Sequence, residues 1–185
     1  VMDEVIYPTV RGMAAEGNVY TGFLYAGLMI DKAGKPKVIE FNCRFGDPET
    51  QPIMVRLESS LVLLVEAALA KALDKVEATW DPRPTVGVVL AAGGYPADYA
   101  KGDVIEGLDA AAELDGKVFH AGTALNAAGE VVTAGGRVLC ATAIGRTVEE
   151  AQQQAYRLAE KVRWNGRFYR NDIGYRAIAR ERGEA

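Results

Sequence analysis

Three polar side chains alternate through one short stretch of the sequence, where single residues separate Glu40, Asn42 and Arg44. Successive side chains of a β-strand point to opposite faces, so these three would share one face at intervals of about 6.5–7 Å. A hard cation such as magnesium takes oxygen ligands and commonly only one or two of them from protein. Glu40 and Asn42 offer such oxygens, and the guanidinium of Arg44 can fork onto a phosphate or carboxylate.

The same alternation also fits an antiparallel strand with a solvated polar face, which is a common arrangement. The residues in between, Ile39, Phe41 and Cys43, form an apolar face that we expect to belong to a core. Downstream, Asp47 is a predicted N-cap with Pro48 at the first helical position. A helix that starts there would turn backbone amides toward an anion, so Asp47 could cap the helix, contact substrate or do both.

The elements that must position these side chains are an amphipathic helix and a hairpin. Apolar residues at three- and four-residue spacings predict the helix over residues 1–16, with a kink or a new start at Pro8. Residues 19–31 are rich in aromatic and branched side chains and predict a strand. A turn at residues 31–35 then leads into the strand that ends at Arg44, which makes the pair a hairpin.

A second, strongly apolar helix is predicted over residues 61–73, and its few charges indicate burial between layers. Residues 74–84 end in a proline-rich segment, which we interpret as a boundary between domains at 1–78 and 79–185. Beyond it we expect strands at residues 85–92, 117–121, 130–133 and 137–145. A capping box at residues 147–150 then predicts a helix that runs to about Val162.

The composition is that of an ordinary globular protein, with 49% hydrophobic and 25% charged residues and a net charge of −4. Lysines and arginines are scattered, so no nucleic-acid surface is predicted. Cys43 and Cys140 lie far apart in strand-like runs and are expected to be reduced, buried thiols. The sequence shows no signal peptide and no apolar run that could span a membrane, so we expect a cytoplasmic protein without a membrane partner.

The remaining candidates are weaker. His120 is the sole histidine, but no nucleophile motif surrounds it, so structural or substrate-proximal packing is favoured over acid–base catalysis. The glycine pairs Gly93-Gly94 and Gly135-Gly136 lack the spacing of a phosphate loop and are interpreted as turns that need positive φ. Arg137 and Arg176 could contact an anion or could be solvated charges.

Residues 40–49, which read Glu-Phe-Asn-Cys-Arg-Phe-Gly-Asp-Pro-Glu, closely resemble the metal-binding signature of the phosphoribosylamine–glycine ligase family, also called glycinamide ribonucleotide synthetases. That family belongs to the ATP-grasp superfamily. The resemblance continues in family order at residues 20–28, 92–96, 119–123, 135–139 and 172–176.

The resemblance implies an α+β fold, in which the C-terminal half of an ATP-grasp module at residues 1–78 is followed by a small β-rich domain with a C-terminal helix at residues 79–185. It also implies that the N-terminal part of the family's enzyme, with the first part of its ATP-binding module, is a missing partner of this chain. We therefore expect the chain alone to be inactive. The resemblance further implies that the intact enzyme is a monomer.

The activity implied by the resemblance joins glycine to 5-phosphoribosylamine at the expense of ATP, in de novo purine biosynthesis. The reaction proceeds through a glycyl phosphate and gives glycinamide ribonucleotide, ADP and phosphate. By the same resemblance, Glu40 and Asn42 hold magnesium or manganese. Arg44 is catalytic and binds the transferred phosphate or the carboxylate being activated, and Asp47 and Glu49 face the amine or the ribose hydroxyls of the substrate.

One departure from the wider superfamily concerns the preceding strand, where many ATP-grasp enzymes carry an acidic metal ligand. Residues 26–30 read Ala-Gly-Leu-Met-Ile and hold no carboxylate, which predicts a weaker or more water-rich metal site. Two alternatives remain, namely another ATP-grasp carboxylate–amine ligase and a non-catalytic β-rich assembly module. Glycine-dependent ADP release by the intact protein would decide against another ligase, and a titration of the intact protein that shows no effect of magnesium or nucleotide would favour the assembly module.

Overall fold

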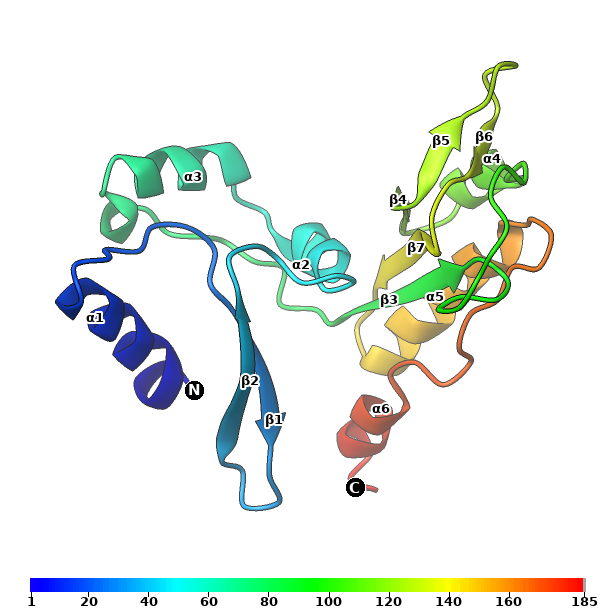
Figure 1. The fold of residues 1–185 in the computed structure, drawn as a ribbon. Helices are drawn as coiled ribbons and strands as arrows, with labels where there is room; N and C mark the ends of the chain where they lie inside the picture. Colours follow the sequence, from blue (N-terminus) through cyan, green and yellow to red (C-terminus); the bar gives the residue numbers. More distant parts are fainter. Residues whose placement is uncertain (185) are drawn as a thin grey trace. The chain divides into compact units, whose positions relative to one another are not determined.

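The computed structural model describes residues 1–184 and combines helices with antiparallel sheets, which confirms the predicted α+β class. The chain divides into two compact units (Figure 1). The first unit contains residues 1–47 and 58–79, and the second contains residues 48–57 together with the chain from Trp80 onward. The candidate metal ligands therefore lie in the first unit, and the larger sheet lies in the second.

The first unit begins with a π-helical segment, Met2–Ile6, that continues as α1, Tyr7–Ala15. Pro8 lies in the first turn of α1, a position that the fixed φ of proline suits. The chain stays helical from Met2 to Ala15 and changes from π to α at Tyr7, so the prediction of a separate helix that starts after Tyr7 is wrong. The helix ends before Gly17, whose φ of +84° suits glycine.

The predicted hairpin is confirmed as β1, Tyr25–Ile30, paired antiparallel with β2, Pro36–Asn42. Its turn is held by Asp31 Oδ1, which accepts from the backbone N–H groups of Ala33 and Lys35, each at 2.9 Å. The strand predicted from residue 19 is wrong in its first part, because β1 starts only at Tyr25. Tyr20 instead donates its hydroxyl to the Phe23 carbonyl at 2.6 Å and closes a local turn through Gly22, where φ is +148°.

The apolar surfaces of the first unit are exposed, contrary to the prediction. Ile39 and Phe41 on β2 are 65% and 41% exposed, and Cys43 is also exposed. Helix α3, Leu61–Leu69, has no buried residue, so it is not the helix between layers that its composition predicts. The reason is geometric, because among the described residues no element covers these apolar faces.

The second unit is built on a three-stranded antiparallel sheet with the order β3-β7-β4. These strands are Thr85–Ala91, Arg137–Ile144 and Lys117–His120, and a smaller sheet pairs β5, Thr123–Leu125, with β6, Val131–Thr133. The helices of this unit are α2, Thr50–Arg56, α4, Leu108–Ala112, α5, Val148–Lys161, and α6, Tyr175–Glu181. The predicted strands β3, β4, β6 and β7 are confirmed, whereas α4, β5 and α6 were not predicted.

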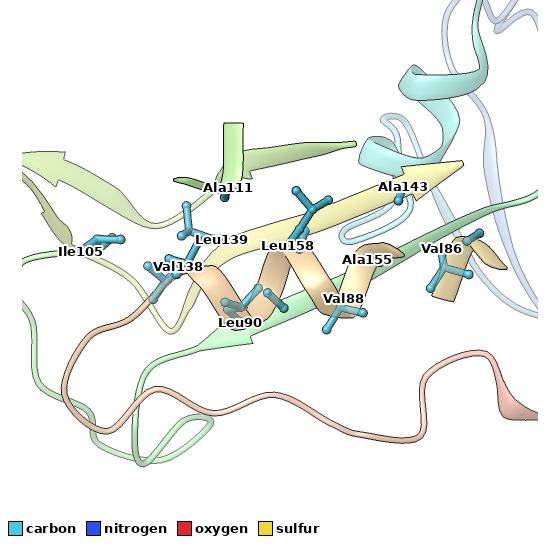
Figure 2. Packing of buried hydrophobic residues seen from close by; sticks show 14 of the residues in the cluster. Val86, Val88, Leu90, Ile105, Ala111, Val138, Leu139, Ala143, Ala155 and Leu158 are labelled. Carbon is cyan, nitrogen blue, oxygen red and sulfur yellow. The ribbon is translucent and has the colours of Figure 1, made fainter. Parts of the chain in front are cut away.

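The core of the second unit lies where α5 packs along β3 and β7 (Figure 2). Val88 and Leu90 from β3 and Val138 from β7 are fully buried against Leu158 of α5. Helix α5 buries Ala151, Ala155, Leu158 and Ala159, which recur at the spacing of one helical face. Thr147 caps this helix by accepting from the backbone N–H of Glu150 at 3.1 Å, which confirms the predicted start.

The proline-rich segment is pinned within the second unit and does not form a loose linker. The backbone N–H of Asp81 donates to the Arg56 carbonyl at 2.8 Å, and the backbone carbonyl of Asp81 accepts from Arg56 Nε at 2.9 Å. The buried Asp81 carboxylate also accepts hydrogen bonds from both Nε and Nη2 of Arg83. These charge-assisted bonds lower the pKa of Asp81 to about 2, because they favour the ionised carboxylate.

A candidate metal and anion site on the hairpin

Glu40 and Asn42 come together on one face of β2, near the end of the strand. The Asn42 amide donates Nδ2–H to Glu40 Oε1 at 3.1 Å, so the carboxylate and the amide lie beside each other. Across the hairpin, Glu40 pairs with Gly27 and Asn42 pairs with Tyr25 on β1. The alternation of side chains in the sequence correctly predicts this juxtaposition.

Arg44 does not continue the row on the strand. Strand β2 ends at Asn42, and Arg44 lies in the bend that follows, where its Nη1 donates to the Phe45 carbonyl at 2.8 Å. The chain bends here so that the Phe45 ring packs against Phe23, with ring centroids 4.3 Å apart. The prediction that Arg44 shares a strand face with Glu40 is therefore wrong.

Asp47 and Glu49 lie in the turn before α2. The helix begins at Thr50 with Glu49 at the N-cap position, and the Glu49 side chain makes no capping hydrogen bond. The predicted N-cap role of Asp47, with Pro48 at the first helical position, is therefore wrong, because the helix starts two residues later. Asp47 belongs to the first unit and Glu49 to the second, and both are exposed.

Sequence reasoning missed a contact beside this site between Tyr20 and Cys43. A hydrogen bond with the Cys43 thiol raises the pKa of the Tyr20 hydroxyl. The two cysteines are free thiols, as the sequence predicts, but the predicted burial is confirmed for Cys140 and wrong for Cys43, which is exposed. Residues far apart in sequence meet here through the loop before β1, so no local pattern could reveal the contact.

The donor set of the hairpin fits a magnesium or manganese ion. Glu40 and Asn42 offer one carboxylate and one amide oxygen, within the range of one or two protein ligands that magnesium commonly uses. Within residues 1–184 no group of three or more His, Cys, Asp or Glu side chains is placed to hold a metal. A cation held here would therefore need water or phosphate oxygens for the rest of its coordination.

The candidates of the second unit have local structural roles. His120 is exposed at the end of β4, with Nδ1 3.0 Å from Thr123 Oγ1. Arg176 donates Nε–H to the Tyr175 hydroxyl at 2.9 Å. Gly94 has a φ of +97°, as a turn requires, but the prediction of positive φ is wrong for Gly93, Gly135 and Gly136.

Close packing, and not a positive φ, explains why glycine occupies position 136. An added Cβ there would collide with the edge of the Tyr95 ring, so the position favours a residue without a side chain. Gly135 lies against the backbone of Gly122 in the same way.

Two family models match the chain in tandem. Residues 1–50 match the ATP-grasp (A) domain of phosphoribosylglycinamide synthetase, and residues 85–176 match the C domain of the same protein. The chain belongs to the phosphoribosylglycinamide synthetase family. The hairpin with Glu40 and Asn42 thus lies within the stretch matched to the ATP-grasp domain, and the β3-β7-β4 sheet lies within the C domain.

Relatives of this synthetase family agree with that assignment and with the resemblance carried by residues 40–49. The chain is 88% identical over 185 residues to a phosphoribosylamine–glycine ligase of Pseudomonas aeruginosa, covering 100% of this chain and 43% of the relative. A ligase of the same name from Vibrio cholerae is 70% identical over 184 residues, covering 100% of this chain and 43% of the relative.

A crystal structure of phosphoribosylamine–glycine ligase from Thermotoga maritima resembles the fold with a TM-score of 0.77 and 40% identity. The match covers 92% of this chain and 41% of that protein. The chain thus spans about two-fifths of the length of the synthetase relatives that it matches. Within the described residues, no helix has the length and apolar character needed to cross a membrane.

Proposed function

We propose that this chain is part of an ATP-dependent ligase that joins glycine to 5-phosphoribosylamine in de novo purine biosynthesis. The observation that carries the proposal is the tandem match of the A and C domains to one synthetase, with an oxygen pair suited to magnesium inside the matched A-domain stretch. The names of the relatives support the same reaction.

The proposed reaction has two steps. The glycine carboxylate takes the γ-phosphoryl group of ATP, which gives glycyl phosphate and ADP. The amine of 5-phosphoribosylamine then attacks the acyl carbon, and phosphate leaves as the amide of glycinamide ribonucleotide forms. Phosphoryl transfer of this kind requires positioning and charge neutralisation more than a protein nucleophile.

Residues of the hairpin and of the segment that follows it suit these requirements. Glu40 and Asn42 would hold magnesium or manganese, which neutralises charge on the phosphates when bound. Arg44 would bind the transferred phosphate or the glycine carboxylate, since its guanidinium carries five N–H donors and the Phe45 carbonyl engages Nη1. Asp47 and Glu49, both exposed, would contact the amine or the ribose hydroxyls.

The domain division that goes with this proposal assigns residues 1–78 to the ATP-grasp module and residues 79–185 to the small β-rich domain. The ligase would act as a cytoplasmic monomer, in which this chain and the remainder of the protein build the ATP site together.

The test is ADP release by the intact protein in a coupled assay. Release should require both glycine and 5-phosphoribosylamine and should yield one glycinamide ribonucleotide per ADP. Release that proceeds equally with a different carboxylate, or that yields no amide product, would assign the protein to another ATP-grasp reaction and overturn the proposal.

A further inference from the structure

Gly27 on β1 lies directly opposite Glu40 on β2, and the Glu40 side chain occupies the space above it. A Cβ added at Gly27 would lie 2.9 Å from Glu40 Cγ and 3.7 Å from Glu40 Oε1. Non-bonded carbon atoms prefer about 3.5–4.0 Å. Any side chain at position 27 would therefore displace the side chain of Glu40, beginning at its Cγ atom.

The glycine is not explained by its backbone conformation. Gly27 is absent from the glycines with positive φ, so alanine could adopt the same backbone angles. Glycine inside a strand weakens it and often marks a place where another group approaches closely. Here the approaching group is the Glu40 side chain, and the hairpin register shifts between Gly27 and Leu28, directly beside this contact.

We infer that Gly27 is a positioning residue that holds the Glu40 carboxylate beside Asn42 for cation binding. The inference rests on the proposed function, because it needs Glu40 and Asn42 to be metal ligands. With the space above Gly27 filled by Glu40, the carboxylate stays within 3.1 Å of the Asn42 amide. Neither the family models nor the names of the relatives assign this role to Gly27.

The test compares Gly27→Ala with the unchanged intact protein in two assays. Free Mn²⁺ is titrated by electron paramagnetic resonance in the presence of ATP, and the rate is measured against magnesium concentration. We expect Gly27→Ala to weaken Mn²⁺ binding about tenfold or more and to raise the magnesium requirement equally. The rate at saturating magnesium and the KM for glycine should change far less, because the ligands themselves remain. Gly12→Ala is the matched control, because its added Cβ would meet nothing within 4 Å.

A parallel Glu40→Gln variant separates this inference from the proposed function. If Glu40→Gln leaves Mn²⁺ binding unchanged, the proposed metal role itself is wrong. If Glu40→Gln weakens binding while Gly27→Ala does not, only the positioning role of Gly27 is overturned.

A double substitution tests whether any destabilisation of Gly27→Ala comes from its contact with Glu40. Glu40→Ala removes the Cγ atom that a Cβ at position 27 would meet, so it should restore any melting temperature lost in Gly27→Ala. A loss that Glu40→Ala leaves unrestored would mean that position 27 excludes alanine for reasons unrelated to Glu40, which would overturn the inference.

Discussion

The two units differ in how far their own residues bury apolar side chains. In the second unit Val88, Leu90, Val138 and Leu158 are completely buried between a sheet and a helix. Among the residues described for the first unit, Val5 is the sole buried apolar side chain, although that unit is also rich in branched and aromatic residues. Apolar composition therefore does not by itself produce a core.

The difference shows that most of the apolar burial and the candidate metal ligands lie in different units of this chain. Burial stabilises by roughly 25 cal/mol for each Å² of apolar surface removed from water, and the α5–β3–β7 layers provide most of that burial. A two-stranded hairpin is marginally stable at best, yet β1 and β2 carry the Glu40–Asn42 pair. Substitutions on the hairpin should change activity, and substitutions in the second unit should change unfolding.

The largest effect is expected from Glu40→Gln in the intact protein. The substitution preserves the shape of the side chain and removes the charge that would hold a phosphate-bridging cation. Turnover should fall by more than about a hundredfold, since such a cation contributes several kcal/mol of transition-state stabilisation. The measurement is glycine-dependent ADP release at fixed magnesium, with the melting temperature measured in parallel.

Glu58→Gln is the matched control, because Glu58 is also an exposed glutamate of the first unit and lies outside the hairpin. It should leave turnover unchanged. Near-normal turnover of Glu40→Gln at modest magnesium would remove the metal role from the hairpin.

The sequence predicted the second unit well because its signals are local. The cap at Thr147, the helical spacing of Ala151, Ala155 and Leu158, and the apolar run of β7 each lie within one element. It missed α4, β5 and α6, which are three to seven residues long and offer too few turns or alternations to show a period.

The candidate site was predictable only within one strand. Alternation placed Glu40 beside Asn42, but it could not show that β2 ends before Arg44. The space above Gly27 depends on the register between two strands and on a local shift in that register, which no single-strand pattern contains. The exposure of Ile39 could not be predicted either, because the identity of an apolar residue does not show whether another element packs against it.

The next largest effect compares one leucine from each unit in this 185-residue chain. Leu158→Ala removes a fully buried side chain and should lower the free energy of unfolding by about 2–5 kcal/mol. Leu69→Ala, at a position that is 74% exposed on α3, should change it by less than about 0.5 kcal/mol. Urea unfolding followed by tryptophan fluorescence measures the second unit, since Trp80 and Trp164 both lie there. Equal losses would show that the units unfold as one.

A smaller effect is expected from removing one helix cap in each unit. Thr147 caps α5 with a 3.1 Å contact, and Ser60 caps α3 with a 3.4 Å contact to the Leu63 N–H. Thr147→Ala should lower the free energy of unfolding by about 1 kcal/mol. Ser60→Ala should instead speed amide hydrogen exchange in the first turn of α3 and leave the tryptophan-monitored transition in place. A shift of that transition by Ser60→Ala would contradict the separation of the two units.

The smallest effect is a pH dependence that belongs to the second unit alone. The Arg83 guanidinium holds the pKa of Asp81 at about 2, whereas an unfolded aspartate titrates near 3.9. Asp81 therefore stabilises the folded unit above about pH 4, and the contribution is lost as the pH falls toward 2, because the unfolded chain binds the proton first. The urea midpoint of Asp81→Asn should lie below that of the unchanged chain at pH 6, and the gap should close toward pH 2. Asp98→Asn, at an exposed turn position, should show no such gap. A gap that persists unchanged at pH 2 would contradict a role for the carboxylate charge, since the backbone bonds of residue 81 to Arg56 are the same in both chains.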